Sequence, residues 1–143
     1  MSTIELQWRE REVGDAQTPR KFLDFVIDGK SLYDKLGDVI SPLGWFLPEH
    51  NQIAVNRFLL LEPADFPDDR RSIYVCPECG DLGCGAVSAI IERSGDQILW
   101  RDFGYQNNYD GSVLFEDYRE LGPFTFDAGE YSDCLKKAAV LGR

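Results

Sequence analysis

Alternating apolar and polar residues predict two strands near the start of the chain. In residues 4–9 and again in residues 23–28, every second side chain is apolar, so each strand would bury one face and expose the other. The apolar members are Ile4, Leu6, Trp8, Leu23, Phe25 and Ile27. Asp24 and Asp28 fall on the polar face of the second strand, and we therefore expect both carboxylates to face solvent.

The middle of the chain has weaker signals. Ser31 predicts a short helix over residues 31–36, because its hydroxyl can accept a hydrogen bond from a free backbone N–H of the first turn. Residues 41–57 contain two prolines and a glycine and predict a loop with a helical turn at 49–56. The apolar run at 58–62 predicts a buried strand, although a buried helical segment can have the same pattern.

The second half of the chain predicts a strand followed by a β-hairpin. The segment SIYVC at 72–76 is rich in β-forming residues. The runs at 86–92 and 97–103 are also β-rich, and Ser94-Gly95-Asp96 lies between them, which is typical of a hairpin turn.

A capping pattern predicts where the last helix begins. Asp127 is followed three residues later by Glu130, and an apolar helical face continues to Gly142, where we expect the helix to end. Five or six strands together with this helix predict an α+β fold. We expect residues 1–143 to form a single domain, mainly an antiparallel sheet with a short helix in the N-terminal half and a C-terminal helix.

The charge of the chain narrows its partners. The 143 residues carry 15 Lys and Arg against 25 Asp and Glu, which gives a formal charge of −10. Nucleic acid is not expected as a ligand, because phosphates require a concentrated basic surface, whereas a cationic protein fits this charge. No apolar run has the length of a membrane span or of an export signal, so we expect a cytoplasmic protein with reduced thiols and no membrane contact.

Three cysteines lie close together in the sequence. Cys76 and Cys79 form a Cys-Pro-Glu-Cys-Gly knuckle and Cys84 follows, a spacing at which thiolates can share one tetrahedral zinc ion. A structural zinc has four ligands, and the candidates for the fourth are Cys134 and the single histidine, His50. Two alternatives remain: thiols that only shape a glycine-rich hairpin, and a redox dithiol, which normally opens a helix rather than a strand.

Acidic and aromatic residues concentrate after the hairpin. Residues 102–133 contain eight acids and one base, and the segment 105–120 predicts a long loop. Carboxylates would speed the encounter with a basic protein, and tyrosines would supply contact area. The candidate partner-binding residues are Tyr105, Tyr109, Asp110, Glu116, Asp117, Tyr118 and Glu120. The acids of residues 62–69 are a second candidate surface.

Known catalytic motifs are missing from the sequence. It contains no nucleophile elbow, phosphate-binding loop, zinc-protease motif or dinucleotide fingerprint. A Ser–His or Cys–His pair would depend on His50 alone. We therefore expect no enzymatic activity.

Three features of residues 74–138 occur together in one family. They are Cys-Gly-Asp-Leu-Gly-Cys-Gly at 79–85, Trp100 in the following strand, and Gly-Pro-Phe-Thr-Phe-Asp at 122–127 before the last helix. In these features the chain resembles an uncharacterised family of small acidic bacterial proteins. The resemblance implies a shared fold and supplies no catalytic residues.

These observations favour a non-enzymatic acidic binding protein. The concrete hypothesis is an immunity or antitoxin-type inhibitor that neutralises a basic bacterial toxin domain through electrostatic and aromatic contacts. The alternatives are a small zinc-stabilised structural domain and a thiol-redox protein.

Overall fold

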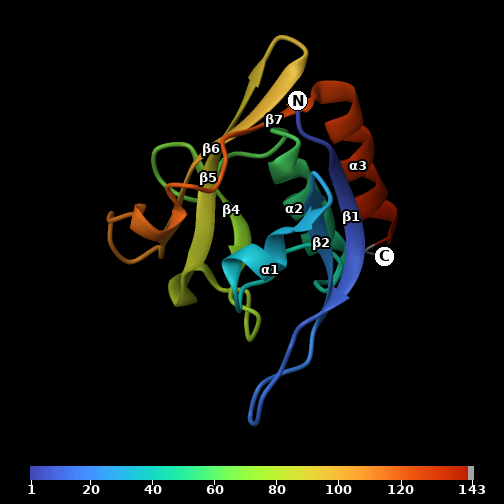
Figure 1. Ribbon diagram of the computed structural model, residues 1–143. Coiled ribbons are helices and arrows are strands. Elements are labelled where there is room, and N and C mark those ends of the chain that lie inside the picture. The colour runs from blue at the N-terminus through green and yellow to red at the C-terminus, as the bar shows by residue number, and fades with distance from the viewer. Residues whose placement is uncertain (142–143) are drawn as a thin grey trace.

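The computed structural model describes residues 1–141, in which two antiparallel sheets pack with three α-helices (Figure 1). The first sheet has the strand order β1 (Ile4–Glu10), β2 (Lys21–Ile27), β3 (Lys30–Ser31). The second has the order β4 (Arg70–Val75), β5 (Ala86–Ser94), β6 (Gln97–Gln106), β7 (Phe124–Asp127). The helices are α1 (Leu32–Leu36), α2 (Pro48–Phe58) and α3 (Ala128–Leu141), with short 3-10 helices η1 (Leu82–Cys84) and η2 (Glu116–Tyr118).

The predicted α+β class and its antiparallel character are confirmed. The helix caps also form as predicted: Ser31 Oγ accepts from the N–H of Asp34, and Asp127 accepts from the N–H of Glu130 at 2.9 Å. The predicted helix end at Gly142 lies outside the described residues. Within residues 1–141, no helix is both long and apolar enough to cross a membrane.

The indole of Trp100 lies at the centre of the main hydrophobic core. It is fully buried, and its ring packs 5.2 Å from Phe25 of the first sheet, 5.9 Å from Phe58 of α2 and 6.1 Å from Tyr131 of α3. Both sheets and two helices therefore share one core around a residue of β6. Aromatic side chains of this size contribute much of the buried apolar area in a chain of this length.

In the middle of the chain, one sequence prediction is wrong and another is confirmed but too short. The apolar run at 58–62 is not a strand, because α2 continues through Phe58 and the chain then turns with Leu60 at a positive φ of 63°. The helix is also longer than the predicted turn, because Pro48 occupies its first turn, where a missing N–H costs nothing. Phe58 at the end of α2 is buried in the core, Leu59 and Leu60 pack against it, and Leu61 is exposed, so the run leaves the core as it ends.

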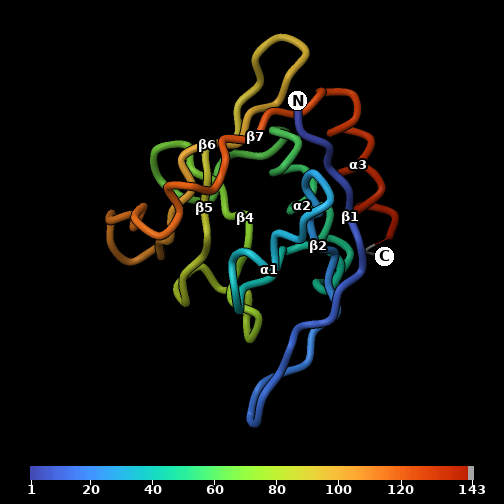
Figure 2. The backbone as a smooth tube through the Cα atoms, viewed as in Figure 1, coloured from blue at the N-terminus to red at the C-terminus, as the bar shows by residue number. Residues whose placement is uncertain are grey.

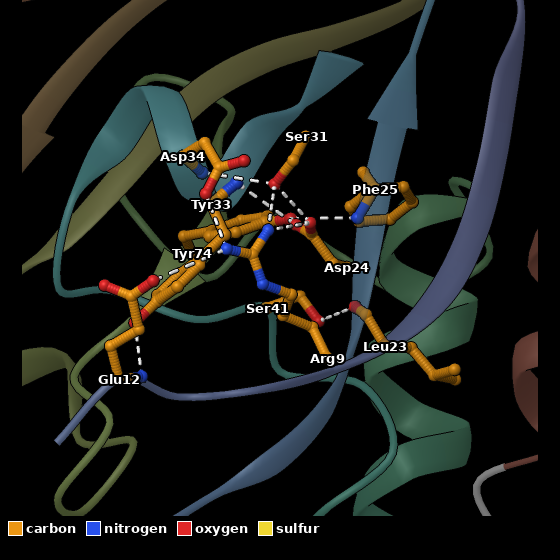
Figure 3. A network of polar contacts seen from close by, with 10 residues as sticks. All are labelled: Arg9, Glu12, Leu23, Asp24, Phe25, Ser31, Tyr33, Asp34, Ser41 and Tyr74. Atoms are coloured by element: carbon orange, nitrogen blue, oxygen red, sulfur yellow. Dashed lines mark hydrogen bonds and ion pairs between the residues drawn. The ribbon is translucent and has the colours of Figure 1, made fainter. Parts of the chain in front are cut away.

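The expectation that Asp24 faces solvent is also wrong. Its carboxylate is buried and accepts hydrogen bonds from the hydroxyl groups of Tyr74 and Ser31 and from the N–H of Tyr33, at 3.1 Å (Figure 3). α1 and β4 cover the face of β2 that the alternating pattern assigned to water. This polar contact joins the first sheet to the second.

A bulge interrupts the pairing of β5 with β6. Ser88 pairs with Gly104 and Ile90 with Arg101, so one residue of β5 faces two residues of β6. Asp102, inside the bulge, has a positive φ of 55°. Bulges bend a strand and redirect its side chains, and this one begins the part of β6 that meets the 107–123 segment.

Candidate functional site

The cysteine-bearing turn connects β4 to β5. Cys76 follows the last residue of β4, and the N–H of Gly80 donates to its carbonyl oxygen at 2.8 Å. Asp81 then caps η1, its carboxylate accepting from the N–H of Gly83 at 2.8 Å. The turn is therefore held by its own backbone before any metal is considered.

The turn brings the three predicted thiols together. The sulfur atoms of Cys76, Cys79 and Cys84 all lie within 4.8 Å of one another, and those of Cys79 and Cys84 are 3.2 Å apart. Sulfurs bound about 2.3 Å from a tetrahedral zinc ion would lie about 3.8 Å from one another. The donor set therefore fits one zinc ion with small side-chain adjustments.

Two glycines let neighbouring aromatic rings approach the turn. Gly80 has a φ of +69°, and a Cβ atom there would lie 2.5 Å from the ring of Phe46. Gly85 has a φ of +95°, and a Cβ atom there would lie 2.1 Å from the hydroxyl oxygen of Tyr105. That hydroxyl donates to the carbonyl oxygen of Cys84 at 3.1 Å. The aromatic contacts thus require glycine on both sides of the thiol cluster.

Two arginines from the β1–β2 connection hold the knuckle. Figure 2 shows this connection (blue) reaching toward the end of the molecule where the cysteine turn lies. The guanidinium of Arg11 donates to the carboxylate of Glu78, and Arg20 donates to the carbonyl oxygens of Pro77 and Glu78, the latter at 2.7 Å. Thr18 Oγ1 also donates to Glu78, at 2.8 Å.

The hydrogen bond between Arg11 and Glu78 favours the ionised forms of both side chains. The Arg11 hydrogen bond, together with those from Thr18, lowers the pKa of the Glu78 carboxyl to about 2. Hydrogen bonds that Arg11 donates to the carboxylates of Asp38 and Glu78 raise the pKa of Arg11, although desolvation opposes this shift. No feature of the sequence alone points to Arg11 or Arg20, since both lie more than fifty residues before the knuckle.

The thiols themselves differ in acidity. Partial burial opposes ionisation of Cys76, but hydrogen bonds from the backbone N–H groups of Glu78 and Cys79 and from the neighbouring thiols outweigh it and lower its pKa. The hydrogen bond with Cys79 raises the pKa of Cys84 to about 11. The residues after Cys84 enter β5, so no helix N-terminus stabilises a thiolate for redox chemistry.

Neither predicted fourth ligand joins the three thiols. Cys134 lies on α3, buried, in a groove that α3 forms with β1. His50 lies on α2, and its ring packs edge-on against Phe46 at 6.4 Å. Within residues 1–141, the cluster therefore offers three protein ligands, and a fourth would come from water or from outside the chain.

The predicted partner-binding residues are divided among three environments. Tyr105 is not in a loop but near the end of β6, half-buried against the cysteine turn. Tyr118 is half-buried and lines a cleft. Tyr109 is 82% exposed, yet its ring lies against Gly83. The carboxylates that remain exposed are Asp110, Glu116, Asp117 and Glu120.

Asp110 has a local structural role. Its carboxylate accepts from both the N–H and the hydroxyl of Ser112, which lowers its pKa. Two apolar residues of the same segment, Leu114 and Phe115, are 65% and 42% exposed and were not singled out from the sequence. Their apolar character inside an acidic loop was the signal that could have identified them.

The segment 107–120 (orange in Figure 1) lies on the side of the molecule away from α3. Tyr109 and Tyr105 place it beside the cysteine turn, so the two candidate regions form one continuous surface. The family resemblance expected for residues 74–138 stays a prediction. The chain matches no protein-family model, no curated protein and no solved structure at a significant level.

Proposed function

We propose that Cys76, Cys79 and Cys84 bind a zinc ion that fixes the turn between β4 and β5. The observation that carries this proposal is the mutual approach of the three sulfur atoms to within 4.8 Å. The zinc would be bound by thiolates, and its charge would favour deprotonation of Cys84 despite the raised pKa of that thiol. The three thiolates would fill three of the four tetrahedral positions of the zinc ion, and water or a ligand from outside residues 1–141 would fill the fourth.

Native mass spectrometry of protein purified without chelator tests the zinc proposal. We expect one zinc per chain in the wild type and none, or a strongly reduced fraction, in Cys79→Ser. Cys134→Ser is the matched control, because that thiol is buried on α3 and takes no part in the cluster. Four free thiols without metal, or equal zinc loss in both variants, would contradict the proposal.

We also propose that the chain is an acidic binding protein that uses the 107–120 segment against a basic partner. The supporting observation is the exposure of Tyr109, Leu114 and Phe115 among carboxylates that make no ion pair within residues 1–141. Exposed aromatic groups surrounded by charge are typical of protein interfaces. An immunity or antitoxin-type inhibitor of a toxin domain is the concrete form of this proposal.

An experiment must distinguish the effect of where the negative charges lie from the effect of the total charge. The loop variant carries Asp110→Asn, Glu116→Gln, Asp117→Asn and Glu120→Gln. The control variant removes four exposed acids elsewhere: Glu5→Gln, Asp15→Asn, Glu49→Gln and Asp133→Asn. Both variants therefore have the same net charge.

We expect a partner that co-purifies with the wild type to be retained by the control variant and lost from the loop variant. The rate at which this partner associates with the wild type should fall steeply between about 50 mM and about 500 mM salt. The reason is that salt screens the electrostatic attraction that brings the two proteins together. Equal capture by the two variants, or association rates that do not depend on salt, would contradict this role for the segment.

A further inference from the structure

A cleft of about 860 Å³ lies between the second sheet and residues 111–123. It opens on the face of the sheet turned away from the Trp100 core. Its apolar walls are Ile90, Leu99, Val113, Phe115, Tyr118 and Leu121. The volume is within the range of small-molecule sites, which are mostly apolar with a few fixed polar groups.

Close backbone contacts hold residues 111–123 against the end of β6 and so form one wall of the cleft. Tyr105 and Leu114 exchange two backbone hydrogen bonds, both 2.9 Å long, which fasten the covering segment to the end of β6. Gly104 makes this possible, because a Cβ atom there would lie 2.5 Å from Val113 Cγ1 and 3.2 Å from the carbonyl oxygen of Leu114. The segment is therefore held in place at one end of the cleft.

Arg70 supplies a buried positive charge to this cleft. The residue is 4% exposed, and its Nε donates to Ser88 Oγ at 3.2 Å and to Gln106 Oε1 at 3.0 Å. Its Nη2 donates to the carbonyl oxygens of Ser88 at 3.1 Å and Asp102 at 2.5 Å. The ring of Phe115 covers the guanidinium, with its centroid 5.1 Å away.

All of these acceptors are neutral. Within residues 1–141, no carboxylate lies within ion-pair distance of Arg70, and its Nη1 makes no hydrogen bond. Desolvation accordingly lowers the pKa of Arg70, although an arginine keeps its charge at neutral pH. Most buried charges in proteins are paired with an opposite charge, so this one is open to an anionic ligand.

The other charged residues of the cleft limit how negative that ligand can be. Arg101 is paired with Glu92 at 2.9 Å and with Asp102, whereas Arg119 is exposed at the rim and makes no ion pair among the described residues. Asp68 and Asp102 also line the cleft. A doubly charged phosphate would meet both carboxylates, whereas a single carboxylate would meet Arg70 with less repulsion.

We propose that this cleft binds a small amphipathic monocarboxylate. Its carboxylate would accept from Nη1 of Arg70, and its apolar body would lie against Leu99, Val113 and Leu121. Arg119 would attract the anion at the entrance. A hydrogen bond from a guanidinium to a carboxylate is charge-assisted and stronger than one between neutral groups, so the acid should be preferred over the matched alcohol.

Calorimetric titration with decanoate and with decan-1-ol tests the proposal, because the two probes share an alkyl chain and differ in charge. We expect decanoate to bind at least about tenfold more tightly than decan-1-ol, the ratio expected from one charge-assisted hydrogen bond. Arg70→Met should remove this preference. Equal affinities for the two probes, or no decanoate binding at millimolar concentration, would overturn the proposal.

A second variant keeps the test decisive if Arg70→Met does not fold. Leu99→Trp fills the cleft and leaves Arg70 unchanged, and it should weaken decanoate binding at least about tenfold. Leu61→Trp is the control, because Leu61 is 70% exposed and does not line the cleft. Unchanged decanoate affinity in a folded Leu99→Trp protein would place the ligand elsewhere and refute the proposed site.

Discussion

The phenol of Tyr74 on β4 donates a hydrogen bond to the buried carboxylate of Asp24 on β2, and its oxygen accepts from the N–H of Phe25 at 2.9 Å (Figure 3). Arg9 lies 3.9 Å from the same carboxylate. A buried carboxylate is costly unless hydrogen bonds compensate its lost hydration. This one is compensated by groups from both sheets and α1, so it ties their positions together.

Tyr74→Phe should therefore destabilise the protein through its polar contacts rather than its packing. The substitution keeps the ring but leaves Phe25 N–H and one carboxylate lone pair of Asp24 without a partner. We expect the free energy of unfolding to fall by about 2–3 kcal/mol, measured by urea denaturation. Tyr33→Phe is the control, since among the described residues its hydroxyl makes a single hydrogen bond, which it accepts from the N–H of Glu12 in a partly buried contact. Equal losses in the two variants would contradict this role of Tyr74.

The same network shows why part of the fold could not be predicted from the sequence. The alternation in residues 23–28 correctly predicts a strand, because it depends on neighbours two positions apart. The burial of Asp24 depends on Tyr74, fifty residues later, and on α1. The helix caps, the turns and the hairpin can also be predicted, because they too depend on residues that are close together in the sequence. The prediction of a strand at 58–62 is wrong because α2 extends through Phe58 and the chain then turns out to the surface.

The candidate sites likewise include features that depend on nearby residues and features that depend on distant ones. The thiol cluster follows from local spacing, and the structure brings together all three thiols. Arg11, Arg20 and Arg70 act on partners far along the chain, and isolated arginines in a sequence carry no sign of such contacts. Tyr105 and Tyr118, which the sequence assigned to a partner-binding loop, are half-buried, Tyr105 at the end of β6 against the cysteine turn and Tyr118 in the cleft.

The hydrogen bond from Arg11 to Glu78 predicts that Arg11 supports metal binding, although Arg11 is not itself a metal ligand. Arg11 also donates to both carboxylate oxygens of Asp38 at 2.8 Å, so it is held rigidly beside the knuckle. Residues that position metal ligands typically contribute about 10- to 100-fold in metal affinity. We expect Arg11→Gln to weaken zinc binding by that factor, measured by competition with a chromophoric chelator.

Arg9→Gln is the matched control for this effect. It makes the same substitution two residues earlier, but Arg9 bonds with Ser31 and Asp34 and not with the knuckle. Its zinc affinity should stay within about threefold of the wild type, well below the loss expected for a residue that positions the ligands. A folded Arg11→Gln protein with wild-type affinity would show that the hydrogen bond from Arg11 to Glu78 does not position the thiols.

The thiol of Cys134 should respond to alkaline pH differently from an exposed cysteine. Burial raises its pKa to about 11, above the ordinary value of 9.0. Because the folded state disfavours the thiolate, the buried neutral thiol contributes stability below pH 9, and this contribution is lost as pH rises toward 11. The stability advantage of the wild type over Cys134→Ala should therefore shrink between these pH values, measured by urea denaturation.

Iodoacetamide labelling followed by peptide mass spectrometry gives an independent check at pH 8. Cys134 should be alkylated at least about tenfold more slowly than Cys79 in metal-free protein, because a buried thiol with a raised pKa is a poor nucleophile. Comparable rates, or a stability difference that does not change with pH, would show that Cys134 is not buried as described.

Gly85→Ala tests the junction between the cysteine turn and β6. Gly85 has φ 95° and ψ 154°, a region that only glycine readily occupies, and an added methyl group would displace the Tyr105 ring and its bond to Cys84 O. We expect a loss of about 2–3 kcal/mol in unfolding free energy by urea denaturation. Gly95→Ala is the control, since its φ is +60° but the space around it is open, and it should cost about 1 kcal/mol. If the two losses are equal, the close approach of Tyr105 to Gly85 contributes nothing to stability.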